Sequence, residues 1–448
     1  MIKAPPTTFW QRFRFIGPSL ILTATLIGSG ELIVTTTYGA QAGFKALWLI
    51  VAACFLKVAI QEALGRYTIS SGDTSLVALN RLPGPRWGAG WAVWIWFICV
   101  ILGAVQLGGI ALTVGECLQV TWGGVSARWW APCVCAVCWA ILCTGRYQVV
   151  EKTSVVLVSL FSISIIGSAI SVQWTRFTIS WSQILEGFSF QLPHAEDFIE
   201  GGSALAVIAV VGLSATEIIY YPYWCLEKGY ARFTGPNDDS EEWLQRARGW
   251  IRVMQLDCYF AMVVYTVTTI AFYLLGAAVL HPQGIVPEGT QVITTLSAMY
   301  TATFGVGAYW VFITCSFLVL FSTLFVSIAS YARLLTDCLG LMKFIRIPDE
   351  FSRRKWVQRF LAFTALLFAT ASQLSRDNFP PLVMIIAGVI PLTFLFLIVS
   401  FTVLYLKYTR LDHRLQPTWI LDVWLWASIL LTLVMTVYAL RPFIDYLS

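Results

Sequence analysis

Charged residues are scarce in this chain. Asp, Glu, Lys and Arg make up 12% of its 448 residues, against about a quarter of a typical soluble domain. Hydrophobic residues make up 58% and form long runs. A soluble globular protein is therefore excluded, and a protein that crosses the bilayer many times is predicted. The net charge of +5 reflects the excess of Lys and Arg in the loops. We expect a lipid bilayer around the chain and no nucleic acid as partner.

Histidine is also rare, and the three copies all fall in predicted loops: His194, His281 and His413. None of them has a nucleophile at a useful spacing, which argues against catalysis. Cys133, Cys135 and Cys138 lie close together, but no histidine or acid accompanies them, so they are expected to pack as small apolar residues. We predict that the protein is not an enzyme and has no cofactor and no resident metal.

The apolar runs predict eleven membrane-spanning helices of about 20 residues each. Their expected ranges are 17–41, 44–65, 91–116, 129–145, 153–173, 203–226, 253–279, 306–334, 358–374, 380–406 and 421–441. Lys and Arg concentrate in alternate loops, so the positive-inside rule places the arm of residues 1–16 in the cytoplasm and the C-terminus outside. The expected location is the plasma (inner) membrane.

The first predicted helix carries polar residues at bilayer depth. Its middle reads Gly28-Ser29-Gly30-Glu31. Each glycine costs a helix about 1 kcal/mol, and a carboxylate at the bilayer centre costs about 2.5–3.5 kcal/mol on insertion scales. Irregular backbone is tolerated at that depth only where protein or a water-filled cavity supplies hydrogen bonds. We therefore predict that two half-helices meet here at a binding site.

The sixth predicted helix has a second interruption. Ser214, Ala215, Thr216 and Glu217 lie at its centre. Pro222, five residues after Glu217, removes a backbone donor and disrupts the preceding turn. The sixth helix is therefore also expected to break.

Two interrupted helices five positions apart are typical of transporters built from inverted repeats, with the binding site near the membrane midplane. The expected first repeat is residues 17–175 and contains helices one to five. The expected second repeat is residues 200–406 and contains helices six to ten. Residues 421–441 add an eleventh helix.

Two stretches of the sequence are similar to a known family. One is the Gly-Pro opening of the first helix, followed by residues 43–48 (GFKALW) and Gln61; the other is Asp257, followed by residues 274–281 (LLGAAVLH). Both resemble the Nramp family of proton-coupled divalent metal transporters. The resemblance implies an all-α polytopic membrane protein with a LeuT-type fold of 5+5 inverted repeats, broken helices one and six, an added eleventh helix, and alternating access.

The family's metal ligands are missing from this chain. Its Asp-Pro-Gly-Asn motif falls on residues 28–31, and its Met-Pro-His motif falls on Ile218, Ile219 and Tyr220. Acids of the family's third helix fall near Gln106 and Gly109. Thioether ligands favour softer metals, and hard cations need several oxygen ligands. A transition-metal site of the family type is therefore not expected.

The remaining residues favour a small oxyanion. Small side chains leave backbone N–H groups accessible, and a half-helix that begins near Glu31 directs its positive dipole end into the break. The expected substrate-binding residues are Gly28, Ser29, Gly30, Ser214, Ala215 and Thr216. An ionised carboxylate repels an anion, but a buried carboxyl can take up a proton and lose that repulsion. Glu31 and Glu217 are therefore the expected proton-coupling residues.

The leading prediction is H+-coupled symport of a small inorganic oxyanion such as bicarbonate. Lys57, inside the second helix, is either a snorkelling residue or an ion-pair partner of Glu31 or Glu62. One alternative takes both glutamates as ligands of a hard divalent cation, Mg²⁺ or Mn²⁺. A second alternative is a receptor-like membrane protein that no longer transports. The sequence does not indicate an oligomeric state.

Overall fold

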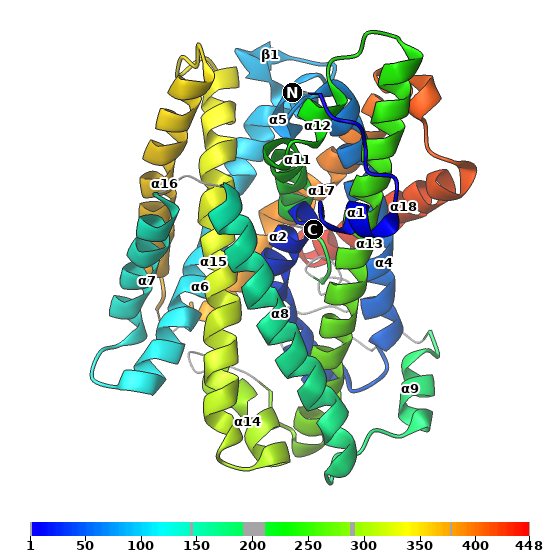
Figure 1. Ribbon diagram of the computed structural model, residues 1–448. Coiled ribbons are helices and arrows are strands. Elements are labelled where there is room, and N and C mark those ends of the chain that lie inside the picture. Colours follow the sequence, from blue (N-terminus) through cyan, green and yellow to red (C-terminus); the bar gives the residue numbers. More distant parts are fainter. Residues whose placement is uncertain (1, 144–146, 191–210, 287–291, 377–378, 448) are drawn as a thin grey trace.

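The structure is a computed structural model that describes residues 2–143, 147–190, 211–286, 292–376 and 379–447. Figure 1 shows a bundle of long helices with one short antiparallel ribbon, formed by β1 (Arg86–Trp87) and β2 (Ala89–Gly90). The N-terminal arm, β1, α5 and α12 lie at one end of the bundle, and α9 and α14 lie at the opposite end (Figure 1).

The first part of the chain forms ten helical elements, including one π-helical and one 3-10 segment. They are α1 (Phe9–Phe13), α2 (Pro18–Leu26), the π-helical η1 (Ile27–Thr35), α3 (Thr36–Ala42), α4 (Leu47–Ser71), α5 (Ser75–Asn80), α6 (Trp91–Trp122), α7 (Ala127–Leu142), α8 (Tyr147–Ser171) and the 3-10 turn η2 (Val172–Trp174). The short helix α9 (Trp181–Gly187) follows.

The second part continues with further long helices joined by short ones. They are α11 (Ala215–Lys228), α12 (Tyr230–Thr234), α13 (Glu241–Leu275), the π-helical η4 (Gly276–Leu280), η5 (His281–Gln283), α14 (Val292–Phe304), α15 (Ala308–Leu341), α16 (Glu350–Ser372), α17 (Pro381–Thr409), η6 (His413–Leu415) and α18 (Trp419–Leu447).

Each of the eleven predicted ranges contains a helix in the described part of the chain. Within the described residues, six helices are long and apolar enough to cross a membrane, namely α4, α6, α8, α13, α15 and α17, and the bent pair within the first range brings the number to seven. Helices α7 and α18 contain shorter apolar stretches. Residues 203–210, the start of the predicted sixth helix, lie outside the described residues, so α11 represents only its second half.

Helix α13 begins at Glu241, twelve residues before the predicted start. Ser240 caps this helix, because its hydroxyl oxygen accepts a hydrogen bond from the backbone N–H of Trp243 at 3.0 Å. An N-cap of this kind satisfies one of the backbone donors that a helix start leaves unpaired. The polar segment and the apolar seventh span therefore form one helix.

Helices α2, η1 and α15 lie in the interior of the bundle. Helix α15 packs against α2, η1, α6 and α8, and α17 packs along α6. Apolar side chains on the outer helices point away from the bundle; Ile163 of α8 and Leu366 of α16 are examples, at 72% and 63% exposed. A bundle with an apolar surface and polar residues inside is what a bilayer requires.

Candidate functional site

The first interruption is a widened helix. The π-helical η1 joins α2 to α3, and the span bends by 43° between Pro18–Leu26 and Gly30–Ala42. The hydroxyls of Ser322 and Thr323 in α15 donate to the carbonyls of Ala24 and Thr25, each at 2.9 Å, just before the helix widens. The predicted interruption of this span is therefore present, as a bend across the π-helical turn between two helical halves. A π-helical turn keeps the backbone amides hydrogen-bonded within the segment, so they are not free for a substrate.

Gly28 allows α15 to approach this widened turn. A Cβ atom at position 28 would lie 1.9 Å from Oγ1 of Thr323. Gly28 therefore contacts α15, whereas Gly30 lines the cavity described below. The side chain of Ser29 is outside the described part of the structure.

Glu31 is fully buried and connects the two interruptions. Its Oε2 accepts a hydrogen bond from the hydroxyl of Thr35 at 2.7 Å, one turn along the same helix. Its Oε1 accepts from the backbone N–H of Gly212 at 3.2 Å. Gly212 belongs to the second interruption, so the carboxyl of Glu31 holds the two segments together.

The second interruption is described from residue 211 onward, as a non-helical segment directly before α11. Residues 211–214 are not helical, and Gly212 has a φ of +71°, a left-handed conformation that favours glycine. A new helix, α11, begins at Ala215. Pro222 lies inside α11 and does not end it. The predicted break is therefore present, but it precedes Ala215.

Glu217 caps the helix on which it lies. Ser214 is the N-cap residue of α11, and the backbone N–H of Thr216 donates to its hydroxyl oxygen at 3.2 Å. The carboxylate of Glu217 accepts from the backbone N–H of Ser214 at 3.0 Å and also from the Ser214 hydroxyl. The hydroxyls of Ser214 and Thr216 are 2.6 Å apart. This reciprocal arrangement is a capping box, in which the acid at the third helical position satisfies donors of the helix start.

Lys57 reaches the same break from α4. Its side chain is 2% exposed, and Nζ donates to the carbonyl of Val211 at 2.7 Å. This carbonyl and the N–H of Gly212 that binds Glu31 belong to one peptide group, so a basic and an acidic side chain hold its two ends. The ammonium also lies 5.5 Å from the ring centroid of Phe396, and its charge interacts with those of Glu31 and Glu217.

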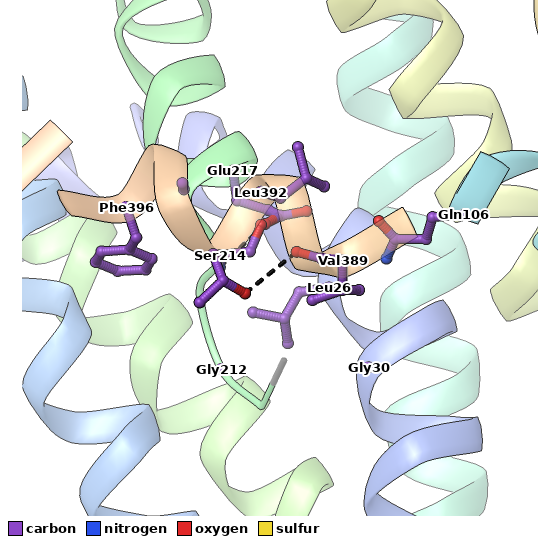
Figure 2. Close-up of a pocket in the computed structure, with 11 residues that line it drawn as sticks. Leu26, Gly30, Gln106, Gly212, Ser214, Glu217, Val389, Leu392 and Phe396 are labelled. Atoms are coloured by element: carbon purple, nitrogen blue, oxygen red, sulfur yellow. Dashed lines mark hydrogen bonds between the residues drawn. The ribbon is translucent and has the colours of Figure 1, made fainter. Parts of the chain in front are cut away.

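A small cavity of about 20 Å³ lies between the two interruptions. It is lined by Leu26, Gly30, Gln106, Gly212, Ser214, Ala215, Glu217, Val389, Leu392, Thr393 and Phe396. Figure 2 shows Ser214 and Glu217 in the middle of this site, with Gln106 and Phe396 on opposite sides. A volume of this size accommodates about one water molecule.

Some predicted site residues are thus brought together and others are not. The cavity is lined by Gly30, Ser214, Ala215 and Glu217. Thr216 does not line it but contacts Ser214. Glu62 binds Arg66 and the side-chain amide of Gln255. Thr393 and Phe396 were not predicted as site residues, because the middle of α17 is mostly apolar and an isolated threonine or phenylalanine there gives no local signal of a site.

The positions that correspond to metal ligands in the Nramp family do not form a metal-binding cluster. Ile218, Ile219 and Tyr220 are buried in α11 and are not among the residues that line the cavity. Among the described residues, no three His, Cys, Asp or Glu side chains gather closely enough to hold a metal ion. Gln106 lines the cavity with a neutral amide, and Gly109 packs closely against α17, since a Cβ there would lie 2.8 Å from the carbonyl of Pro381.

Comparison with known proteins identifies the family. The chain is similar to the divalent metal cation transporter MntH of Deinococcus radiodurans, with 23% identity over 66% of this chain and 62% of that protein. An uncharacterised protein of Pasteurella multocida is 22% identical over 80% of this chain and 77% of that protein. Among solved structures, a manganese transporter of Eremococcus coleocola in complex with an aromatic bis-isothiourea compound matches with a TM-score of 0.71 at 14% identity, covering 99% of this chain and 90% of that one.

A more distant structural match extends the comparison beyond this group. MhsT in complex with L-phenylalanine matches with a TM-score of 0.59 at 15% identity, covering 98% of this chain and all of that one. The predicted all-α LeuT-type architecture is confirmed by these structural matches. The family model described as natural resistance-associated macrophage protein-like matches residues 19–441. The chain therefore belongs to the Nramp family and is an integral membrane protein of the secondary-transporter type.

Proposed function

We propose that this Nramp-family protein carries out H+-coupled symport of a small oxyanion such as bicarbonate. The observation that carries the proposal is the buried ammonium of Lys57 at the break before α11. A fixed positive charge beside the cavity attracts an anion and repels a divalent cation. The N-terminus of α11 adds its backbone N–H groups and the positive end of its dipole.

Glu217 already occupies the place that an anionic substrate would take. Its carboxylate accepts the Ser214 N–H and the Ser214 hydroxyl, which are the donors a small oxyanion needs. Protonation removes the negative charge and weakens the hold of this carboxyl on the helix start. The Ser214 donors then become available, and displacement of the side chain enlarges the cavity for the substrate. Proton and anion therefore enter the site together.

Glu31 supplies the second proton-coupling group. Its carboxyl binds Gly212 across the two interruptions. When it takes up a proton, one acceptor oxygen becomes a donor and its attraction to Lys57 is lost. Lys57 then carries an uncompensated positive charge, which the anion neutralises. This exchange of partners explains why transport of the anion requires a proton.

The predicted topology belongs to the same proposal. We place the N-terminal arm, α5 and α12 in the cytoplasm and the C-terminus of α18 outside, in the plasma membrane. The domain boundaries at residues 17–175 and 200–406 remain the expected limits of the two repeats.

Transport of a divalent cation is the second candidate. It is favoured by the relatives named as manganese and divalent metal cation transporters, and by the two carboxyl groups next to the cavity. In this case Glu31 and Glu217 stay ionised, and the cation keeps part of its water shell. The charge of Lys57 argues against it.

Purified protein in liposomes with a trapped pH indicator distinguishes the two functions. Nitrate added outside at pH 6.5 is expected to acidify the lumen only when the protein is present, and bicarbonate is expected to acidify it faster with the protein than without it. Protein-free liposomes measure the CO2 that crosses the bilayer unaided, and nitrate is a probe without a volatile form. Uptake of radioactive Mn²⁺ that is unaffected by either anion, with no anion-dependent acidification, would overturn the proposal in favour of cation transport.

A further inference from the structure

The start of the first span is capped by a residue from another helix. Gly17 is the N-cap of α2 and has no side chain with which to cap it, and Pro18 has no N–H. The buried carboxylate of Asp257, in α13, accepts the backbone N–H of Gly17 and that of Ser19, each at 2.8 Å. The acid therefore satisfies the donors of a helix that begins 240 residues earlier in the chain.

Further contacts fix the backbone just before α2. The hydroxyl of Tyr230 donates to the carbonyl of Phe15 at 2.7 Å. Lys228, at the end of α11, donates to the carbonyl of Ile16 at 3.3 Å and forms an ion pair with Glu151 of α8. We call these contacts and those of Asp257 the α2 clamp. It ties the start of the first span to α8, α11, α12 and α13.

Hydrogen-bond donors surround Asp257 on several helices. Tyr221 of α11 donates its hydroxyl to Oδ2 of Asp257 at 3.1 Å. The titratable groups that interact with it are Tyr221 and Cys225 of α11, Tyr147 of α8, Tyr230 of α12 and Cys258 of α13. The charged groups nearest to these in the clamp are Lys228 and Glu151, which pair with each other. In the described part of the chain, no Lys or Arg forms a salt bridge with Asp257. Its charge is therefore stabilised by these donors and by the dipole of α2.

We propose that Asp257 is a positioning residue that links proton binding to opening of the α2 clamp. The ionised carboxylate holds the N-terminus of α2 through two charge-assisted hydrogen bonds. A proton on Asp257 converts one oxygen into a poor acceptor and removes the charge that the helix dipole favours. The start of the first span then separates from α11 and α13, which opens a path from one end of the bundle toward the cavity.

This role deepens the proposed H+ coupling and rests on it for its biological meaning. It differs from the roles of Glu31 and Glu217, because Asp257 contacts neither the cavity nor the break before α11. Its effect is on the conformation of α2. The structural claim can therefore be tested without any substrate.

Hydrogen exchange followed by mass spectrometry on the wild-type protein in detergent provides the test. After correction for intrinsic exchange rates, the amides of residues 15–26 are expected to lose about tenfold of their protection between pH 8 and pH 5, about the worth of a charge-assisted contact. Asp257→Asn carries no charge at either pH, so its protection is expected to be low at both. Wild-type protection with an unchanged pH response in Asp257→Asn would overturn the proposal.

Gly17→Ala tests the clamp without altering the acid. The φ of Gly17 is 166°, outside the left-handed region that favours glycine. The Cβ of the alanine would lie 2.0 Å from Oε1 of Glu151, so the Glu151 side chain must move, which disturbs its ion pair with Lys228. Residues 15–26 are then expected to exchange faster even at pH 8. Asp238→Asn, an exposed acid before α13, is the matched control and should behave as wild type. Faster exchange along the whole chain in both test variants would indicate unfolding and overturn the proposal.

Discussion

Each of the two interruptions contains a buried glutamate, but the backbone around the two glutamates differs. In the first span, η1 stays helical, and Glu31 is held by Thr35 and by Gly212 of the other segment. In the sixth span, residues 211–214 are not helical, and Glu217 caps the start of α11. The widened helix keeps its own amides paired, whereas the break supplies the donors of the site.

This difference assigns different tasks to the two segments. The first segment is bent and packs against α15. Its acid, Glu31, contacts the second segment through the hydrogen bond from Gly212. The second contains the helix N-terminus, where a substrate or a carboxylate binds. The start of α11, with Glu31 of the first segment hydrogen-bonded beside it, is therefore sufficient to build the site.

Removing the titratable group of each interruption should separate these tasks most strongly. Glu31→Gln keeps an oxygen acceptor for Gly212 but cannot take up a proton, so H+-coupled uptake in liposomes is expected to fall by about two orders of magnitude. Glu217→Gln preserves the capping box, because glutamine is also accepted at that position. Its uptake should persist, with an apparent affinity for the anion that no longer depends on pH between 5 and 7.

A larger loss of uptake in Glu217→Gln than in Glu31→Gln would contradict the different tasks assigned to the two segments. Equal loss in both would mean that the two acids act as one group. Thermal melting of each variant is the control for folding, and both are expected to melt as wild type.

Crowding the first interruption tests whether it is a packed support. Gly28→Ala inserts a Cβ 1.9 Å from Oγ1 of Thr323, and such overpacking typically costs about 1–3 kcal/mol. Thr323→Ala in the same chain removes the hydroxyl and should restore part of the stability. A double-mutant cycle on melting temperature measures this coupling. Additive effects would show that Gly28 does not face α15.

The second interruption should respond to backbone strain. Gly212→Ala forces a left-handed φ on alanine, at a cost of about 1–2 kcal/mol, and brings Cβ to 3.2 Å from Cα of Cys54. Gly284→Ala is the matched control, because Gly284 has a φ of +64° and no heavy atom near the added Cβ. The Gly212 variant is expected to lose more stability and also anion uptake. Equal melting temperatures with unchanged uptake would contradict a break specified by Gly212.

The number and order of the helices were predictable from the sequence, because apolar runs must cross the bilayer as helices. The form of each interruption was not. Gly28-Ser29-Gly30 indicates a weakened helix, whether the helix breaks or widens there. Only the packing of α15 against Gly28 favours a widened turn. Ser214 and Glu217 have the capping-box spacing that marks the start of α11, whereas Pro222, taken as a further sign of a break, lies inside that helix.

The composition of the site was partly predictable for a related reason. Buried polar residues in apolar runs are conspicuous, and Glu31, Lys57 and Glu217 all lie at the two interruptions. Phe396 is one of many aromatic residues in an apolar helix, and its position beside Lys57 follows only from tertiary packing.

An acid outside the membrane distinguishes titration of the interruptions from a general effect of pH on stability. Arg414 binds Asp412 with its Nη2 2.7 Å from Oδ2, and these hydrogen bonds hold the pKa of Asp412 below its ordinary value. A carboxyl whose pKa is lowered on folding stabilises the folded state above its unfolded pKa of about 3.9, and this contribution is lost as the pH falls through its folded value. The free energy of unfolding of Asp412→Asn is therefore expected to be lower than that of wild type at pH 7, by less than about 1 kcal/mol, and equal to it at pH 2.5. Because this change lies below pH 4, the pH dependence of transport between 5 and 7 should be the same in Asp412→Asn as in wild type. A shift of that transport profile would mean that stability, and not the acids of the two interruptions, sets the response to protons.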